Sequence, residues 1–370
     1  MIDLELKNIT KKFGDFTAVS DFSLQVEKGE FISFLGPSGC GKTTTLRMIA
    51  GFIEPTHGEI LIQGNRVNGV PPNHRDTGMV FQNYALFPHM TVFENVAFGL
   101  KYRDVPKKEI KVRVREILEM VQLPDVENRK PSQLSGGQQQ RIALARALVI
   151  RPKVLLFDEP LSNLDAKLRE SLRVELREIQ QEVGITSIFV THDQEEALAL
   201  SDRIVVINEG KVTQIDSPRN VYENPGTIFI GDFIGQSNFL NGRIFSIDDD
   251  RVRVSLQNGL QIGAALATEK LAENDSVKVL IRAERIRVSS APRKNHLEDE
   301  TNVLKGTIRE TSYLGSNIHY YIRLENGDRL MAIEQTAEKK PFTRGDEVFI
   351  EFGTKSSRCF QIEMKGPDTP

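Results

Sequence analysis

The fold of this chain is decided by one stretch of sequence, Gly36-Pro37-Ser38-Gly39-Cys40-Gly41-Lys42-Thr43-Thr44. An apolar run that predicts a buried strand precedes it at 30–35, and a predicted helix that ends at a glycine follows it at 45–51. Glycine lets the backbone turn tightly enough for successive N–H groups to surround phosphate oxygens. The lysine then reaches the β- and γ-phosphates, and the first threonine is placed to ligate Mg²⁺. We expect the loop to bind a nucleoside triphosphate, because an ordinary glycine-rich turn does not need this complete spacing.

The length and composition of the chain indicate a globular protein of two or three domains. It has 370 residues, 39% of them hydrophobic and 27% charged, with a formal net charge of −3. This balance gives no sign of a nucleic-acid partner. No apolar run approaches the ~18 residues that span a bilayer, and the N-terminus lacks the apolar core of a signal peptide. The two cysteines, Cys40 and Cys359, fit a reducing compartment. We therefore expect a cytoplasmic protein that meets a membrane only through a partner.

Two carboxylates end a second apolar run. Residues 154–157 predict a strand buried on both faces, and Asp158 and Glu159 follow it. Ligand sites of parallel sheets lie at the carboxyl ends of their strands, where Asp158 can hold Mg²⁺ and Glu159 can polarise an attacking water. The alternative is a solvated acidic pair. Another apolar strand, residues 186–191, ends in His192 in the same way, although a lone histidine is usually structural.

A second glycine pair opens a different helix. Ser135 is a good N-cap for a helix that runs to about residue 148, and Gly136, Gly137 and Gln138 follow it. The glycines let another surface approach the positive end of that helix, which predicts a second anion site. A glycine-containing cap without a functional role is the alternative.

Aromatic residues suggest two further contacts. Phe13 precedes a turn upstream of the phosphate loop, where its ring either stacks on a base or packs into the sheet. Gln82 stands at the end of a predicted strand, and the segment 84–93 after it is unusually apolar for one bounded by proline and polar residues. Its aromatic residues form either part of the core or an exposed docking surface, and we favour docking.

The chain changes character near residue 235. Strands and helices alternate before it, which predicts an α/β domain with a largely parallel sheet. After it, short strands follow one another, with the hairpin turns Asn258-Gly259 and Asn326-Gly327 between them. We therefore expect a separate β-barrel-like domain over residues 236–370.

Together these motifs resemble the nucleotide-binding subunits of ATP-binding-cassette (ABC) transporters. The stretch 36–44 is similar to the Walker A motif, 154–159 to Walker B and 134–138 to the LSGGQ signature. In the same comparison Phe13 corresponds to the A-loop aromatic, Gln82 to the Q-loop, 162–165 to the D-loop and His192 to the H-loop. The resemblance implies an α/β P-loop NTPase domain over residues 1–235, with a helical subdomain at about 83–150, and an all-β, OB-like TOBE domain at 236–370.

The resemblance also implies roles for these residues. ATP and Mg²⁺ are the expected cofactors, Thr43, Gln82 and Asp158 the expected Mg²⁺ ligands, and adenine the expected partner of Phe13. The expected catalytic residues are Glu159, His192 and Gln82. Glu159 activates water, His192 stabilises the γ-phosphate, and Gln82 contacts Mg²⁺ or that water and signals to the segment 84–98. In a head-to-tail dimer, the Walker A loop of one copy shares its ATP with the signature residues of the other, which are Ser135, Gly136, Gly137 and Gln138.

Residues 81–90 and the β-rich domain are similar to bacterial importers of the polyamine, ferric-iron and maltose group, and the pattern at 84–100 favours spermidine or putrescine. The expected partners are two permease subunits that dock near Tyr84–Phe98, an extracytoplasmic solute-binding protein, and no nucleic acid. The expected location is the cytoplasmic face of the inner membrane, as a peripheral subunit.

Ferric iron, a sugar or another small solute are alternatives to a polyamine as the transported solute. A soluble ATPase of ribosomes or nucleic acid is disfavoured by the single Walker A motif. The β-rich domain either binds a regulator or only widens the dimer interface.

Overall fold

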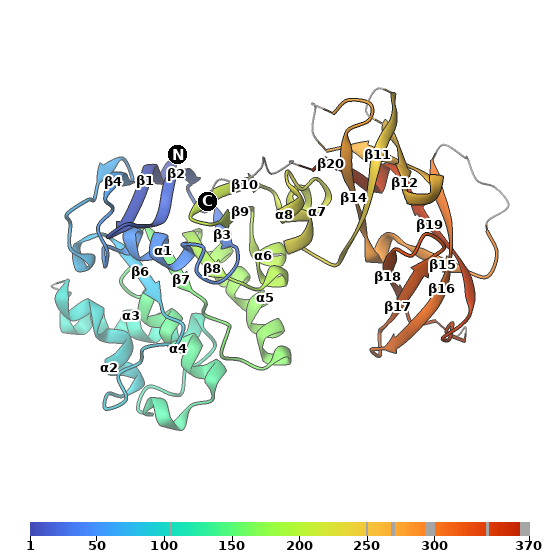
Figure 1. Ribbon diagram of the computed structural model, residues 1–370. Helices are drawn as coiled ribbons and strands as arrows, with labels where there is room; N and C mark the ends of the chain where they lie inside the picture. Colours follow the sequence, from blue (N-terminus) through green and yellow to red (C-terminus); the bar gives the residue numbers. More distant parts are fainter. Residues whose placement is uncertain (104, 249–250, 268–270, 293–299, 338–339, 363–370) are drawn as a thin grey trace. The chain divides into compact units, whose positions relative to one another are not determined.

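This computed structural model describes residues 1–103, 105–248, 251–267, 271–292, 300–337 and 340–362 (Figure 1). The chain forms two compact units, Met1–Pro218 and Arg219–Pro370. The elements of the first unit are β1 (Ile2–Phe13), β2 (Phe16–Glu27), β3 (Phe31–Leu35), α1 (Lys42–Ala50), β4 (His57–Ile62), β5 (Asn65–Arg66), β6 (Thr77–Val80), α2 (Val92–Ala97), α3 (Lys107–Met120), α4 (Gly136–Leu148), β7 (Val154–Asp158), α5 (Ala166–Val183), β8 (Thr186–Thr191), α6 (Gln194–Leu200), β9 (Arg203–Asn208) and β10 (Lys211–Asp216).

A six-stranded sheet in the order β10-β9-β3-β8-β7-β6 carries the first unit. Strand β3 pairs in parallel with β8 and β9, and β7 pairs in parallel with β6 and β8. Strand β10 is antiparallel to β9, and a separate four-stranded sheet has the order β2-β1-β4-β5. The predicted α/β class is confirmed. Because the carboxyl ends of β3, β7 and β8 meet at one edge, the segments that follow these strands come together there.

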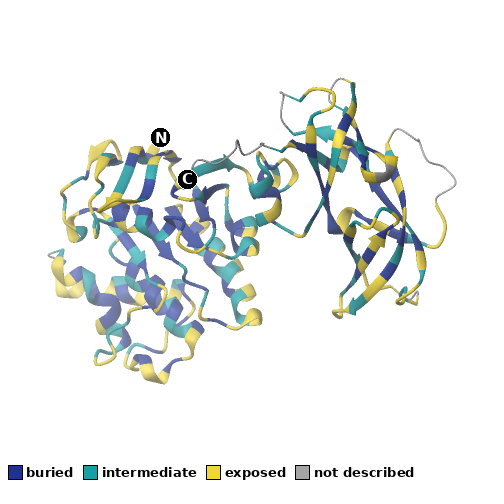
Figure 2. Cartoon of the chain, in the orientation of Figure 1, coloured by how far each residue is buried: buried dark blue, intermediate teal, exposed yellow. Residues whose placement is uncertain are grey.

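The central strands are buried on both faces. In β7, Val154 and Leu156 join one hydrophobic cluster, whereas Leu155 and Phe157 join another. Successive side chains of a strand point to opposite faces, so each face packs against its own layer. Figure 2 shows the buried strands inside the first unit. Burial on both sides explains why these strands read as continuous apolar runs in the sequence.

The helix after the phosphate loop ends at a well-defined cap. Gly51 follows α1 in the left-handed region, with φ 84. The guanidinium of Arg75, a fully buried residue, donates from Nη1 to the carbonyls of Met48 and Ile49 at 2.7 and 3.3 Å. A cation at this position complements the negative end of the helix. Arg75 therefore fixes the far end of the helix whose first turn faces the phosphate loop.

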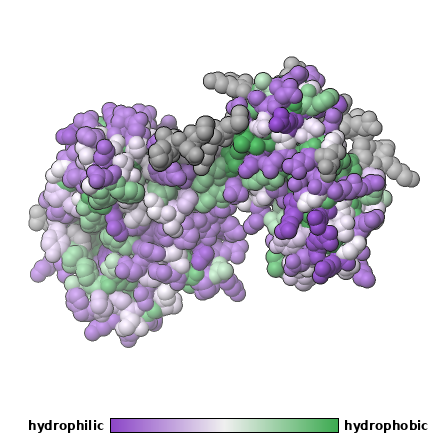
Figure 3. All heavy atoms as spheres, in the orientation of Figure 1, coloured by the Kyte–Doolittle hydropathy of each residue, from purple (hydrophilic) through white to green (hydrophobic). Residues whose placement is uncertain are grey.

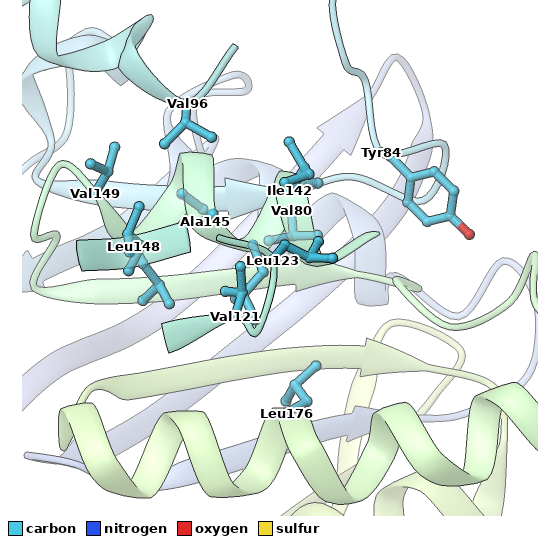
Figure 4. Packing of buried hydrophobic residues seen from close by; sticks show 14 of the residues in the cluster. Val80, Tyr84, Val96, Val121, Leu123, Ile142, Ala145, Leu148, Val149 and Leu176 are labelled. Carbon is cyan, nitrogen blue, oxygen red and sulfur yellow. The ribbon is translucent and has the colours of Figure 1, made fainter. Parts of the chain in front are cut away.

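Helices α2, α3 and α4 form a cluster within residues 83–150. One face of α3 is buried, and Val114 and Leu118 are its most enclosed members. Figure 4 shows Ile142, Ala145 and Leu148 of α4 among the side chains of this cluster. The helical subdomain boundaries stay a prediction.

The second unit is rich in β structure. Its elements are α7 (Pro218–Glu223, whose first residue closes the first unit), α8 (Ile228–Phe233), β11 (Ser237–Asp248), β12 (Arg251–Leu256), β13 (Gln261–Leu266), β14 (Ser276–Arg282), β15 (Arg287–Ser289), β16 (Thr301–Tyr313), β17 (Asn317–Leu324), β18 (Arg329–Gln335), β19 (Glu347–Gly353) and β20 (Ser357–Gln361). Strands β11-β12-β13-β20-β14 close a barrel, and β15-β19-β16-β17-β18 form a sheet. The predicted turns at Gly259 and Gly327 both connect antiparallel neighbours, with φ 79 and 94.

The short helices α7 and α8 belong to the second unit, although the sequence places the domain boundary near residue 235. Arg282 at the end of β14 explains this difference. Its Nη1 donates to the carbonyl of Gly231 at 2.9 Å and its Nη2 to that of Tyr222 at 2.7 Å. The guanidinium also lies 4.3 Å from the centre of the Tyr222 ring. These contacts hold both helices against the barrel, and the boundary at residue 235 stays a prediction.

Candidate functional site

The phosphate loop joins β3 to α1 at the carboxyl edge of the large sheet. A Cβ at Gly36 would lie 2.1 Å from the carbonyl oxygen of Ile207, and one at Gly41 would lie 2.6 Å from that of Ala18. Gly41 also has φ 103, a backbone conformation that residues with a side chain rarely adopt. Glycine is therefore required at both positions, because neighbouring backbone presses against the loop.

Lys42 lies inside this loop and is only 5% exposed. Its Nζ donates to the carbonyls of Gly36 at 2.6 Å and Pro37 at 2.8 Å, and lies 3.8 Å from the Sγ of Cys40. None of these three partners supplies a counter-charge to the ammonium. A buried cation without a counter-charge favours an anion nearby. The loop fits the triphosphate that the sequence predicts.

The side chain of Cys40 points away from this role. It is 4% exposed, belongs to the hydrophobic cluster beneath the loop, and burial raises the pKa of its thiol. If Cys40 contacts phosphate as predicted, it does so through its backbone N–H and not through its thiol. Ser38 and Gly39 are exposed at the tip of the loop, and Pro37, Thr43 and Thr44 are half-buried.

Thr43 and Asp158 bring two oxygen ligands together. Thr43 Oγ1 donates to Asp158 Oδ1 at 3.1 Å, and Arg47 lies 3.9 Å from the other carboxylate oxygen. Burial raises the pKa of Asp158, while the bond from Thr43 and the charge of Arg47 oppose the rise. Within the described ranges no group of three or more acidic, histidine or cysteine side chains could hold a metal. The pair suits Mg²⁺, which takes one or two protein oxygens and completes its shell with phosphate and water.

Glu159 and His192 meet at the ends of β7 and β8. His192 Nδ1 lies 3.1 Å from Glu159 Oε2. Glu159 adopts φ 46, and its N–H donates to the carbonyl of Val190 at 3.0 Å. The left-handed conformation is uncommon outside glycine and turns the carboxylate sharply out of the strand direction. The structure therefore brings these two predicted residues to one place.

Two other predicted residues lie at the surface. Phe13 is 49% exposed beside the turn between β1 and β2, with Lys11 Nζ 5.0 Å from the ring centre. It is therefore not a core residue, and its stacking on adenine stays a prediction. Gln82 is also exposed, and its backbone carbonyl accepts a hydrogen bond from Asn163 Nδ2 at 2.8 Å. This bond joins the predicted Q-loop to the predicted D-loop. It involves only the backbone of Gln82, so the role of the Gln82 side chain stays a prediction.

The signature residues form the N-terminus of α4. Ser135 Oγ accepts from the N–H of Gln138 at 3.3 Å, and Gln138 Oε1 accepts from the N–H of Ser135 at 3.0 Å. This is a complete capping box. A Cβ at Gly137 would lie 3.1 Å from Leu168, so this glycine lets α5 approach α4. Gly136 is exposed and faces open space apart from Leu164 at 3.5 Å. No described hydrogen bond or ion pair joins these residues to the Walker A loop.

The sequence does not predict the role of Arg146. Its guanidinium donates to the carbonyls of Ala85 at 2.6 Å and Tyr84 at 2.9 Å, and lies 5.7 Å from the centre of the Phe87 ring. Tyr84 and Ala85 are consecutive left-handed residues, with φ 61 and 48. Such a pair is strained and persists only where its surroundings hold it. Arg146 on the signature helix is the group that holds it.

The predicted docking segment is partly core. Tyr84 is 8% exposed and packs at the edge of the helical cluster (Figure 4), so it is not a surface residue. Phe87, Phe93 and Phe98 are half-buried, and the rings of Phe87 and Phe98 lie 4.6 Å apart between centres. Figure 3 shows hydrophobic surface over the region where Figure 1 labels α2. The half-buried rings thus remain available for docking.

Asp158→Asn should raise the melting temperature of the nucleotide-free protein at neutral pH, because an amide accepts the bond from Thr43 without the cost of a buried charge. It should lower ATP hydrolysis by at least about 100-fold.

The folded pKa of Asp158 is raised above its ordinary 3.8, so the folded state holds the proton more tightly. The penalty on folding grows as pH rises above that value. The thermal gain should therefore shrink as the pH is lowered towards 4, and a gain independent of pH would contradict this account.

Arg146→Gln should destabilise the full chain by about 2–4 kcal/mol in urea, because two carbonyls lose a charged donor. Hydrogen exchange at residues 83–90 should speed up as the strained pair relaxes. Arg141→Gln is the matched control. It removes a guanidinium from the same helix, but this guanidinium pairs with Glu175 and does not contact the 83–90 segment's carbonyls in any described bond. Unchanged exchange at 83–90 in the Arg146 variant would show that the arginine does not hold the segment.

Comparison with known proteins agrees with this geometry. The profile described as ABC transporter matches residues 19–162, and the TOBE domain profile matches residues 279–360. The chain is 51% identical to the spermidine/putrescine import ATP-binding protein PotA of Rubrobacter xylanophilus. The alignment spans 347 residues, which are 94% of this chain and 90% of that protein. PotA 2 of Pseudomonas aeruginosa is 48% identical over 360 residues, 97% of each chain.

Solved structures match about three-fifths of the chain. A dimeric ATP-binding cassette in a post-hydrolysis state, bound to ADP and Pi, is 37% identical with a TM-score of 0.52 and covers 58% of this chain and 99% of its own. The protein cbiO1 from Clostridium perfringens, part of the ABC transporter complex cbiONQ, is 30% identical with a TM-score of 0.56 and covers 60% and 90%. Among the described residues, no helix has the length and apolar character that a membrane crossing needs. The chain therefore belongs to the ABC transporter family, as an ATP-binding cassette followed by a TOBE domain.

Proposed function

We propose that this chain is the ATP-hydrolysing subunit of a polyamine importer, with spermidine or putrescine as the transported solute. The observation that carries the proposal is the identity of 51% to a spermidine/putrescine import protein over 94% of the chain. The similarity extends through both units, so it exceeds what a shared cassette alone requires. Importers of ferric iron, sugars or other small solutes are the alternatives that the experiment below separates.

The carboxyl edge of the sheet supports the assigned reaction. Lys42 and the loop N–H groups would hold the triphosphate, and Phe13 would stack on adenine. Thr43 and Asp158, with Gln82, would hold Mg²⁺, which neutralises charge on the phosphates when bound. Glu159 would orient the attacking water, and its contact with His192 would hold the imidazole near the γ-phosphate. The strained backbone at Glu159 is consistent with a residue placed for catalysis.

The exposed N-terminus of α4 supports a second copy of the chain as partner. The capping box fixes Ser135 and Gln138, while Gly136 leaves the helix end open to an approaching anion. A helix N-terminus binds phosphate through its free N–H groups. Since this end makes no described polar contact with its own Walker A loop, we infer that it completes the ATP site of a second copy, head to tail.

Membrane partners follow from the family. We infer that two permease subunits dock near residues 84–98, where Phe87, Phe93 and Phe98 are half-buried. The bond between Asn163 and Gln82 joins the predicted D-loop to the predicted Q-loop, and it would couple the ATP site to that segment. An extracytoplasmic solute-binding protein would deliver the polyamine, and the chain would act at the cytoplasmic face of the inner membrane. No nucleic-acid partner is proposed.

Glu159→Gln tests the assigned reaction. ATP hydrolysis should fall by about 10²–10⁴-fold, the contribution of a general base, while ATP binding is kept and the ATP-bound dimer lasts longer. Glu170→Gln, which removes an exposed carboxylate from α5, should leave hydrolysis unchanged. Hydrolysis by the Glu159 variant at the parent rate would remove this residue from its role.

The substrate is tested in membranes. The chain is reconstituted with its membrane subunits and solute-binding protein, and ATP hydrolysis is measured with spermidine, putrescine, ferric iron or maltose. The proposal predicts stimulation by the polyamines alone. Stimulation by iron or maltose without a response to polyamines would contradict it and leave the ATPase assignment intact.

A further inference from the structure

A basic hollow in the second unit has no part in the ATP reaction. The hollow has a volume of about 290 Å³ and lies among five basic side chains with one carboxylate, that of Glu223. We call it the basic hollow and define it by its charged members, which are Arg219, Glu223, Arg282, Arg285, Lys355 and Arg358.

The fold, not one run of sequence, assembles these charges. Arg219 comes from α7, Arg282 ends β14, and Arg358 lies on β20. Strands β14 and β20 pair antiparallel, with Leu280 opposite Arg358, which places their basic residues beside each other. Lys355 precedes β20 in a short 3₁₀ turn. Three separate stretches of chain, 219–223, 280–285 and 355–358, thus place positive charge around one hollow.

Nearby carboxylates do not neutralise this charge. Glu223 is shared between Arg219 at 3.3 Å and Arg285 at 3.7 Å. Glu300 lies 3.6 Å from Lys355, and Glu284 accepts the hydroxyl of Tyr222. Burial and Glu284 raise the pKa of Tyr222 to about 12, so the phenol stays neutral. Among the residues that the structure describes, the five cations outnumber the carboxylates around the hollow, even with Glu284 and Glu300 counted.

Arg282 supplies the second observation. It is only 4% exposed, and its terminal nitrogens are used by Gly231, Ser237 and Tyr222. Its buried Nε, by contrast, has no hydrogen-bond partner among the residues that the structure describes. Arg282 therefore adds a buried positive charge to the lining of the hollow.

We propose that the basic hollow binds a small phosphate-bearing anion. Guanidinium groups bind phosphate oxygens in pairs, and Lys355 adds a point charge. The hollow has room for a phosphate that carries a sugar, a nucleoside or a second phosphate. Binding would tie Arg219 of α7 to Arg285 and Arg358 of the barrel. It would thereby stiffen the chain just after Pro218, where the first unit ends.

The test measures pyrophosphate binding to the full chain by calorimetry, in a Lys42→Ala background that weakens binding at the Walker A loop. Arg285→Gln with Lys355→Gln should weaken binding by about tenfold or more, because two charged contacts are lost. Both side chains are at least half exposed, at 51% and 72%, so the fold should be kept. Lys108→Gln with Arg329→Gln removes two exposed charges elsewhere and should leave the affinity unchanged.

Three results would overturn the proposal. The first is the same affinity in the Arg285 and Lys355 double variant, with unchanged circular dichroism. The second is no binding at millimolar pyrophosphate in the Lys42→Ala chain. The third is binding to phosphatidylglycerol vesicles through Arg285 and Lys355 without binding of soluble pyrophosphate, since this would assign the hollow to a lipid headgroup. Each outcome is independent of which solute the transporter carries.

Discussion

The ATP site depends on one interaction, the enclosure of the Lys42 ammonium by its own loop. The ammonium is enclosed by backbone carbonyls of that loop, and that enclosure exists only because Gly36 and Gly41 let neighbouring backbone approach the loop closely. A charge removed from water and given neutral partners favours an anion strongly. The parallel sheet then determines what else surrounds that anion, since β7 and β8 end at the same edge as β3.

The residues at this edge are kept there at a cost to stability. Burial disfavours the charged form of Asp158, and the backbone of Glu159 is held in an uncommon conformation. Tyr84 and Ala85 store similar strain where the segment leaves the Q-loop. Sites that bind and turn over ligand commonly carry such costs. Here Arg146 connects one of them to the signature helix, so the proposed half-site for a second copy and the proposed docking segment share one rigid element.

Much of this arrangement could be predicted from the sequence because its chemistry is local. The spacing of Gly36, Gly41 and Lys42 specifies the loop, and Ser135 with Gln138 specifies a capping box. Other features depend on tertiary packing. Neither tyrosine nor alanine favours a left-handed backbone, so the pair that Arg146 holds gives no sequence signal. The burial of Cys40 and Arg282 and the packing of α7 and α8 on the barrel also arise only after the strands pair. The transported solute is not encoded in the site at all, and rests on similarity across both units.

The central claim is that the Walker A loop is half of an ATP site and that a second copy supplies the rest. The most direct measurement mixes two inactive variants. Lys42→Ala removes the buried cation, and Gly136→Asp places a carboxylate at the open end of α4, where the side chain fits because its nearest neighbour is 3.5 Å away. Neither variant should hydrolyse ATP alone. An equal mixture should recover about a quarter of the parent rate, since half of the random dimers are mixed and each of these has one intact site. A mixture as inactive as its components would contradict the shared site.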